Sequence, residues 1–366
     1  MLNWRDPLNP LAGGAERVSM GYLKALIARG HEVFWFSNTF DGAVNVEEVD
    51  GIQVIRRGNR FSSQFFAARW YRSQAPFDLV IDQHHGLPWF APWWCQTQCV
   101  AFIHEVLGPI WDSFYSWPLS AIGKTQESAT HWLYRSVPFW TASSATANLL
   151  LERGVSDITQ IPYGVDTRAL PELDSKALVQ PLRLVTVNRL APNKRVDHAI
   201  RVVKILVDEG IDVHLTIIGD GEMSLAWRGL TIELGVHMHV AFTGQISEKE
   251  KDDHLRLSHF LLYTSVREGW GLSVTEANAL GTPAAVYPVG GLNESTIAGV
   301  TGIVSENETP RSLAESLLHA LTEPDVYQNY RRAAWKRAME FHWDNVLPKA
   351  CDWLESVAAG RHRSVR

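Results

Sequence analysis

The sequence has few cysteines and no long hydrophobic run. Its 366 residues include only Cys95, Cys99 and Cys351, an odd number that argues against a disulfide framework and indicates reduced thiols. No apolar stretch approaches the roughly 20 residues that a membrane-spanning helix requires. The first residues also lack the profile of a signal peptide. We therefore expect a cytoplasmic protein.

The sequence also lacks an excess of positive charge and several catalytic motifs. Its net charge of −6 argues against nucleic acid as a partner. No Gly-x-Ser-x-Gly motif, Walker phosphate loop or zinc-type Cys/His spacing occurs. Gly13-Gly14 opens a predicted helix, but the following residues lack the Gly-x-Gly-x-x-Gly spacing of a dinucleotide enzyme. These absences disfavour serine hydrolases, P-loop NTPases and NAD-dependent enzymes.

What the sequence does have is a repeated order of apolar strands and helices. Hydrophobic residues make up 46% of the chain, enough for two cores at this length. A helix from Gly14 to Arg29 is followed by strands at 33–36, 53–55, 78–82 and 100–103. A second series has strands at 182–187, 213–218, 239–242, 260–263 and 284–287. The alternation predicts an α/β protein with two parallel sheets.

The domain boundaries follow from this order. The polar, proline-containing connection near 170–181 separates an N-terminal Rossmann-like domain, residues 1–170, from a C-terminal one, residues 171–340. Only residues 1–4 precede the first polar loop, so the first strand is expected to be short. Residues 341–366 predict a C-terminal helix that crosses back to the N-terminal domain, followed by a basic tail.

The most informative stretch runs from Arg267 to Glu276. It places Glu268 in a loop after a buried strand and Glu276 about two turns into a helix, roughly 10 to 15 Å away by helix rise. That separation is too wide for an acid/base pair on one glycosidic bond. It suits two carboxylates that hold hydroxyls at the two ends of an extended polar ligand, with helix N-terminal amides facing an anion between them.

The segment Glu-Gly-Trp-Gly-Leu with the second Glu resembles the donor site of retaining nucleotide-sugar glycosyltransferases of the GT-B fold, glycosyltransferase family 4. The resemblance implies two Rossmann-like domains facing across a cleft. It implies that Glu268 contacts the donor sugar and that Glu276 holds the ribose hydroxyls. It further implies that backbone amides meet the sugar and diphosphate, from the segment that comprises Gly269, Trp270, Gly271 and Leu272.

The same resemblance assigns other residues at predicted strand ends. Arg189 and Lys194 follow the first strand of the second series, where a forked guanidinium and a mobile ammonium can neutralise a diphosphate. Gly14 is expected to contact the donor, and His104 to contact the donor sugar and exchange a proton near neutral pH. Arg195 is interpreted as an ordinary surface charge. With Glu268, the catalytic residues implied are His104, Arg189 and Lys194.

The resemblance also implies the chemistry. Sugar transferases of the other main fold hold a metal on Asp-x-Asp, which this chain lacks, so no metal and no cofactor are expected. Retention implies front-face attack without a protein nucleophile, and the substrate is a UDP- or GDP-sugar. Two alternatives stay open: a non-catalytic nucleotide-sugar-binding subunit, and another GT-B enzyme such as a nucleotide-sugar epimerase.

The acceptor side rests on a basic, aromatic stretch. Residues 52–74 contain five arginines and no acidic residue, interleaved with aromatic side chains. Arg56, Arg57, Arg60 and Trp70 are therefore candidates for contacting a glycan or lipid-linked acceptor, or an anionic membrane on its inner face. Alternatively, the aromatic side chains pack on the sheet and the arginines are solvated.

Overall fold

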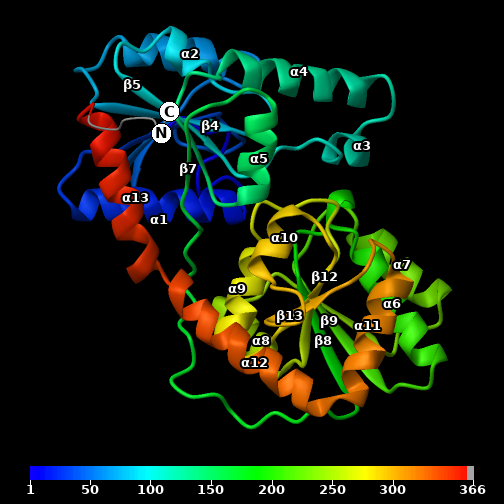
Figure 1. The fold of residues 1–366 in the computed structure, drawn as a ribbon. Helices are drawn as coiled ribbons and strands as arrows, with labels where there is room; N and C mark the ends of the chain where they lie inside the picture. The colour runs from blue at the N-terminus through cyan, green and yellow to red at the C-terminus, as the bar shows by residue number, and fades with distance from the viewer. Residues whose placement is uncertain (361–366) are drawn as a thin grey trace. The chain divides into compact units, whose positions relative to one another are not determined.

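The chain folds into two compact units in a computed structural model that describes residues 1–360 (Figure 1). Unit 1 comprises Met1–Gly108, Trp117–Gly164 and the described residues from Trp343 onward. Unit 2 comprises Pro109–Ser116 and Val165–His342. Each unit is a mainly parallel sheet covered by helices, so the expected α/β class with two Rossmann-like domains is confirmed. The predicted basic tail lies outside the described residues.

Unit 1 is built from seven strands and its own helices. Its strands are β1 (Phe34–Ser37), β2 (Val46–Val49), β3 (Ile52–Arg56), β4 (Leu79–His84), β5 (Gln98–Ile103), β6 (Phe139–Thr141) and β7 (Ile158–Gln160). Its helices are α1 (Gly14–Ala28), α2 (Ser63–Tyr71), η1 (Ala91–Trp93), α4 (Leu119–Leu133), α5 (Ser144–Glu152) and α13 (Trp343–Ala358).

The first residues of the chain complete the unit 1 sheet. The strands form two ladders, β1-β3-β2 and β4-β5-β6-β7. Leu2 bridges both in parallel, pairing with Phe36 of β1 and Asp82 of β4. The Leu2 amide donates to Ile81 at 2.8 Å and the Gln83 amide donates to Leu2 at 3.0 Å. The short first strand that the sequence predicts therefore occupies the position between β1 and β4.

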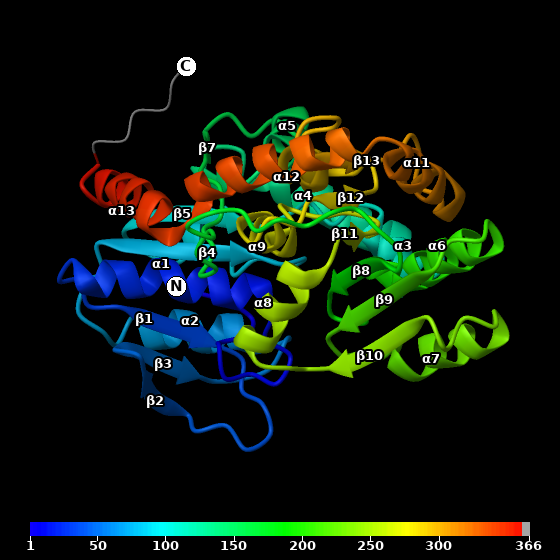
Figure 2. The ribbon, with the colours of Figure 1, turned by 90° about the horizontal axis from the view of Figure 1, so that it is seen from below.

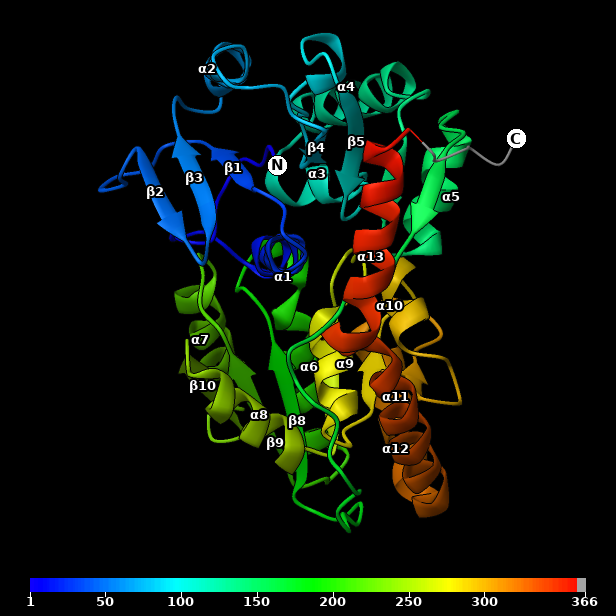
Figure 3. The same cartoon turned by 90° about the vertical axis from the view of Figure 1, so that its left-hand side faces the viewer.

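Helices cover the two faces of the unit 1 sheet. Figures 1 and 3 show α1 on one face and α2 with α4 on the other. Aromatic side chains fill the layers between them, among which Trp35, Trp89 and Trp140 are fully buried. Trp140 stacks on Phe102 with ring centroids 4.2 Å apart. Large flat side chains thus supply much of this core, because each buries a large area at little entropic cost.

The last helix returns to unit 1 because Trp343 fits against two glycines. A Cβ at Gly164 would lie 2.1 Å from the Trp343 ring, and one at Gly21 would lie 2.9 Å from it. The indole also meets Tyr22 edge-on, with centroids 5.3 Å apart. Only glycine leaves room for this ring at both places, so α13 is anchored by shape on the helix and loop of unit 1.

Unit 2 has a six-stranded parallel sheet. Its strands are β8 (Leu182–Val187), β9 (Val213–Ile218), β10 (Val240–Gly244), β11 (Phe260–Tyr263), β12 (Ala284–Val286) and β13 (Gly302–Val304). Its helices are α3 (Ile110–Phe114), η2 (Pro192–Lys194), α6 (Val196–Asp208), α7 (Ser224–Glu233), α8 (Glu248–Leu257), α9 (Leu272–Ala279), α10 (Gly290–Ser295), α11 (Pro310–Thr322), α12 (Pro324–Ala338) and η3 (Met339–Phe341).

The strand order of unit 2 fixes where a ligand can bind. The order β10-β9-β8-β11-β12-β13 is that of a doubly wound sheet, visible edge to edge in Figure 2. The chain winds outward from β8 to β10 and then restarts with β11 on the other side of β8. We call the junction between β8 and β11 the switch point. Open α/β sheets bind ligands at this point, outside the carboxyl ends of the strands.

The sheet of unit 2 is buried on both faces. Helix α6 packs with α7 and α11, while α9 packs with α8 and α12. Every residue of β11 and β12 is buried, as is typical of parallel strands covered on two sides. Unit 2 also holds α3, which packs against η2 although it lies within the sequence of the first predicted domain. No helix among residues 1–360 has the length and apolarity needed to cross a bilayer.

Candidate functional site

The loops after β8 and β9 are joined at the carboxyl edge of the unit 2 sheet. The Leu190 amide donates to Asp220 at 2.9 Å, and the Met223 amide donates back to Leu190 at 2.9 Å. Glycine is required here, because a Cβ at Gly219 would lie 2.0 Å from the Asn188 carbonyl oxygen. The Gly219-Asp220-Gly221 turn therefore joins the backbones of the two loops next to Arg189.

The loops after β8 and β11 are joined across the switch point. The Val266 amide donates to Asn193 at 2.8 Å. Arg195 has a left-handed backbone with φ of 46° and donates to the Thr264 and Ser265 carbonyls at 2.9 and 2.8 Å. Only 17% of its side chain is exposed. The interpretation of Arg195 as an ordinary surface charge is thus wrong, because it clamps one loop to the other.

This clamp brings together two of the predicted site residues. The Lys194 ammonium forms an ion pair with the Glu268 carboxylate, directly at the switch point. The pair is largely withdrawn from solvent, with 19% of the Lys194 side chain and 12% of the Glu268 side chain exposed. The Ser265 hydroxyl donates to the same Glu268 oxygen at 3.1 Å. A cation and a hydrogen-bond acceptor therefore stand side by side where an α/β sheet binds its ligand.

Arg189 lies on the same loop as Lys194 but has a different partner. Its guanidinium contacts Glu222 at 3.1 Å, beyond the Gly-Asp-Gly turn. About half of each side chain is exposed, 49% for Arg189 and 41% for Glu222. Exposed ion pairs of this kind contribute little to stability and exchange partners at low cost. Sequence reasoning did not identify Glu222 as a neighbour of the site.

The segment from Gly269 to Leu272 forms the tight turn into α9. Gly271 takes φ of 87° at the helix cap, a conformation that glycine adopts without strain. Gly269 lies against α10, since a Cβ at Gly291 would be 2.4 Å from its carbonyl. Trp270 is buried, with its ring nitrogen donating to Thr275 at 3.1 Å. The indole therefore anchors the turn, and contact between the backbone amides of this segment and a donor stays a prediction.

Glu276 is buried in α9 and held by a residue from another helix. Its side chain is 3% exposed, and its carboxylate lies 3.1 Å from the Lys251 ammonium of α8. The predicted helix over this stretch is confirmed as α9, which begins at Leu272. Glu268 and Glu276 thus have separate cationic partners. The structure does not pair them with each other.

His104 belongs to unit 1, at the end of β5. The Gln83 amide donates to His104 Nε2 at 2.8 Å, so Nδ1 carries the proton and donates to Tyr163 at 2.5 Å. Burial lowers the pKa of His104 to about 3. The imidazole is therefore neutral at physiological pH, and the expectation that it exchanges protons near neutral pH is wrong. Its assignment as a sugar contact stays a prediction.

Gly14 begins α1 in unit 1. The preceding Gly13 amide donates to the Glu16 carboxylate at 2.7 Å, and Glu16 lies 3.3 Å from Arg5. One amide at this helix end is therefore already occupied by a buried carboxylate of the chain itself. Contact between Gly14 and a donor stays a prediction.

The chain matches two family models that lie end to end. Residues 174–337 match "Glycosyl transferases group 1", and residues 12–169 match "Glycosyltransferase Family 4". The chain belongs to glycosyltransferase family 4. A glycogen synthase of Mycobacterium tuberculosis is 28% identical over 235 residues, which are 63% of this chain and 57% of that enzyme. The match thus spans less than two thirds of the synthase.

Solved structures show the GT-B fold for this family 4 chain. A sucrose-phosphate synthase from Thermosynechococcus elongatus superposes with a TM-score of 0.79, 19% identity and coverage of 95% of this chain and 94% of that one. Anabaena HepE in complex with UDP and glucose superposes with a TM-score of 0.75, 15% identity and coverage of 97% and 98%. At these identities the likeness concerns the fold alone.

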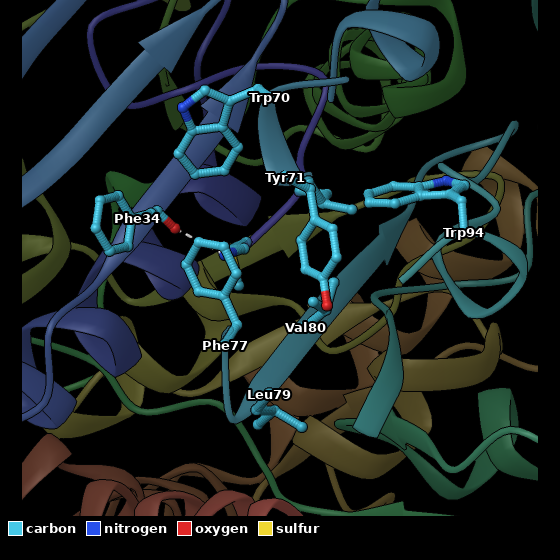
Figure 4. Close-up of a pocket in the computed structure, with 9 residues that line it drawn as sticks. Phe34, Trp70, Tyr71, Phe77, Leu79, Val80 and Trp94 are labelled. Atoms are coloured by element: carbon cyan, nitrogen blue, oxygen red, sulfur yellow. Dashed lines mark hydrogen bonds between the residues drawn. The ribbon is translucent and has the colours of Figure 1, made fainter. Parts of the chain in front are cut away.

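One acceptor-side candidate of this family 4 protein is corrected by the structure, and a second lines a pocket. Arg56 is fully buried in β3, where it donates two hydrogen bonds of 2.7 Å to Asp6 and pairs with Glu47. It therefore cannot touch an acceptor or a membrane. Trp70 points inward and lines a small apolar pocket of unit 1 (Figure 4), whose lining residues are Met1, Leu2, Phe34, Trp70, Tyr71, Phe77, Leu79, Val80 and Trp94.

The other two candidates keep their exposure. Arg57 and Arg60 lie on the loop before α2, and the Arg60 guanidinium covers the Phe61 ring at 4.6 Å. Phe61 and Phe65 are 77% and 67% exposed. The stretch 52–74 is therefore part strand and part helix, with its aromatic side chains divided between a buried pocket and the surface.

Proposed function

We propose that this family 4 protein is a retaining, metal-independent glycosyltransferase that moves a sugar from a UDP- or GDP-sugar to a glycan or lipid-linked acceptor. The observation that carries the proposal is the ion pair of Lys194 and Glu268 at the switch point of unit 2. Eight residues after Glu268, on the helix that the same turn opens, stands the buried carboxylate of Glu276.

Lys194 and Arg189 are the groups that receive the donor diphosphate. Both now face carboxylates, Glu268 and Glu222, which a dianionic diphosphate replaces with a stronger counter-charge. Glu268, released from the ammonium, accepts a hydroxyl of the sugar. The ion pair of Lys194 and Glu268 is thus exchanged for two contacts with the donor, one to phosphate and one to sugar.

The proposed reaction keeps the configuration at the sugar carbon C1. The bond between C1 and the diphosphate oxygen breaks as the acceptor hydroxyl forms its bond to C1 on the same face. The acceptor proton passes to the departing phosphate oxygen, so no protein nucleophile takes part. Lys194 and Arg189 stabilise the charge that develops on the leaving diphosphate, which preorganised cations do without solvent reorganisation.

On unit 1, the proposal gives His104 a role in binding the sugar. A neutral imidazole offers one donor and one acceptor nitrogen for hydrogen bonds to hydroxyls, but it carries no extra proton to give to the acceptor. Tyr163 and Gln83 hold its ring in one orientation. His104 therefore contacts the sugar through whichever nitrogen exchanges its present partner, and Gly14 offers a backbone amide of α1.

The acceptor side of the proposal includes an anionic membrane surface. On the sheet face that bears α2 and α4 (Figure 1), α2 and the loop before it expose arginines and phenylalanines, while α4 and its approach expose large apolar side chains. The exposed residues are Arg57, Arg60, Arg69, Arg72, Phe61, Phe65, Trp117, Leu119, Ile122 and Trp132. Basic and aromatic side chains together favour the interface of anionic lipid.

Replacing Lys194 by alanine tests the proposed function. Sugar transfer from the UDP- or GDP-sugar that the wild type uses is measured together with the melting temperature. Loss of one charge contact to the leaving group is expected to lower turnover by about a hundredfold or more. Lys204→Ala, which removes a half-exposed lysine of α6 paired with Asp208, is the matched control and should transfer normally.

Near-normal transfer by a folded Lys194→Ala variant would refute the proposal. A wild type that binds the nucleotide sugar without transferring it to any glycan or lipid acceptor would favour the non-catalytic binding subunit. A wild type that changes the donor sugar without an acceptor would favour an epimerase.

A further inference from the structure

Helix α9 is buried along nearly its whole length yet carries a carboxylate. All residues from Ser273 to Ala279 are buried, and Glu276 among them is 2% exposed. Removing an ionised carboxylate from water is costly unless a cation and hydrogen bonds compensate for it. A helix in this environment is expected to carry an apolar residue at that position if packing alone were selected.

Lys251 supplies the compensating charge. It lies in α8, with 7% of its side chain exposed, and its Nζ is 3.1 Å from Glu276 Oε1. The same ammonium contacts Glu248 at 2.5 Å, one turn earlier in α8, and the Glu248 side chain is 69% exposed. Lys251 thus connects a buried carboxylate to a solvated one, and it fixes α8 to α9 at the level of Glu276.

Stability does not account for such a pair. Replacing a buried ion pair by apolar residues of similar volume is often neutral or stabilising, because desolvation consumes the attraction between the charges. A pair retained in a buried helix therefore calls for a ligand that needs the carboxylate. Glu276 lies in the second turn of the helix that begins at Leu272, next to the turn that carries Glu268.

We propose that Lys251 is a positioning residue that holds the Glu276 carboxylate in the orientation needed to accept the ribose hydroxyls of the donor nucleotide. This inference rests on the proposed function and extends it to a residue on a different helix. A carboxylate that accepts from two neighbouring hydroxyls must keep its orientation. The Lys251 ammonium, 3.1 Å from Glu276 Oε1, provides this without contacting the nucleotide.

The test compares ribose and 2′-deoxyribose nucleotides. Binding of UDP, GDP, 2′-deoxy-UDP and 2′-deoxy-GDP is measured by calorimetry on the full chain. The wild type should prefer the ribonucleotide over its deoxy counterpart by about tenfold or more, the value of a hydrogen bond to a charged group. In Lys251→Met, which keeps the apolar stem, this preference should fall to about twofold or less. Affinity for the deoxy nucleotide should change much less.

Two further variants separate positioning from structure. Lys251→Arg keeps a cation and should recover part of the preference for ribose. Lys249→Met removes an exposed lysine two residues earlier on α8 and should leave the preference unchanged. A purely structural Lys251 would lower the melting temperature of Lys251→Met but leave the ribose preference intact, and that result would overturn the inference.

Every other outcome is also decisive. If Lys251→Met does not fold, the double variant Lys251→Met/Glu276→Gln removes both charges together and should fold without a ribose preference. A folded double variant that still prefers ribose overturns the inference. A wild type that binds neither UDP nor GDP removes the proposed function itself. A wild type that binds one of them without discriminating against its deoxy form leaves the proposed function standing and removes only the role given to Glu276 and Lys251.

Discussion

Two cations on the loop after β8 are paired with carboxylates on the two neighbouring loops of unit 2. Lys194 faces Glu268, and Arg189 faces Glu222. Each cation is thus matched by a carboxylate of opposite charge. A diphosphate bound as we propose would compete with a carboxylate of the chain for each cation. The Lys194–Glu268 pair is partly buried and the Arg189–Glu222 pair is exposed. We therefore expect the loss of Lys194 to weaken donor binding more than the loss of Arg189.

Arg195 gives the clearest prediction for a single residue outside the reacting groups. Its guanidinium donates to the Thr264 and Ser265 carbonyls and covers the Tyr287 ring at 5.1 Å. Arg195→Met leaves those carbonyls without a charged donor, so the free energy of unfolding should fall by about 1 to 3 kcal/mol. Urea denaturation measures this. Donor affinity should fall as well, because Ser265 positions Glu268.

The matched control for Arg195 is Arg201→Met, an exposed arginine of α6. The midpoint of its urea denaturation should equal that of the wild type. Equal midpoints for Arg195→Met and Arg201→Met would show that the clamp between the loops after β8 and β11 contributes nothing.

Among the elements, those buried on both faces were predicted most accurately. The bounds predicted for β8, β9 and β11 match the structure, because continuous apolar runs ended by polar residues define a parallel strand on their own. The sequence does not predict β2, β6, β7 or β13. Strands of three or four residues have too little periodicity to be distinguished from loops unless, as at β12, a longer apolar run marks them.

Element packing also decides how the basic stretch is used. The sequence predicts the exposure of Arg57 and Arg60 but cannot predict that Arg56 faces Asp6 in the interior. Alternation along a strand places neighbouring residues on opposite faces, and the acidic partner lies fifty positions away in the sequence. Likewise, the contact of Lys251 with Glu276 arises from the packing of α8 on α9, which the sequence does not predict.

The α2 region yields a prediction about membranes. Arg57→Glu combined with Arg60→Glu should lower the partition onto phosphatidylserine-containing vesicles by at least about tenfold, since each basic residue near the surface contributes about 1 kcal/mol. Sedimentation with vesicles of phosphatidylcholine, with and without phosphatidylserine, measures the effect. Arg201→Glu with Lys249→Glu makes the same change in net charge on unit 2 and should bind like the wild type. Equal partition of the wild type onto vesicles with and without phosphatidylserine would refute the proposed binding to an anionic membrane.

In the molecule as a whole, the two units carry different kinds of side chains beside their sheets. Unit 2 holds the charged pairs that suit a nucleotide sugar, and unit 1 holds the neutral His104 and the basic, aromatic surface of α2. Sequence order does not follow this division. Residues from Trp343 onward belong to unit 1, and Pro109–Ser116 belong to unit 2. The packing of Trp343 on Gly164 and Gly21 explains the first case in terms of shape.

The central claim is that fixed cations of unit 2 bind a nucleoside diphosphate without a divalent ion. Calorimetric titration of the full chain with UDP and with GDP, in buffer containing EDTA, tests it most directly. One nucleotide should bind the wild type in EDTA, and Lys194→Met should weaken that binding by about tenfold or more. Binding that requires added Mg²⁺ or Mn²⁺, or that is unchanged in Lys194→Met, would contradict the claim.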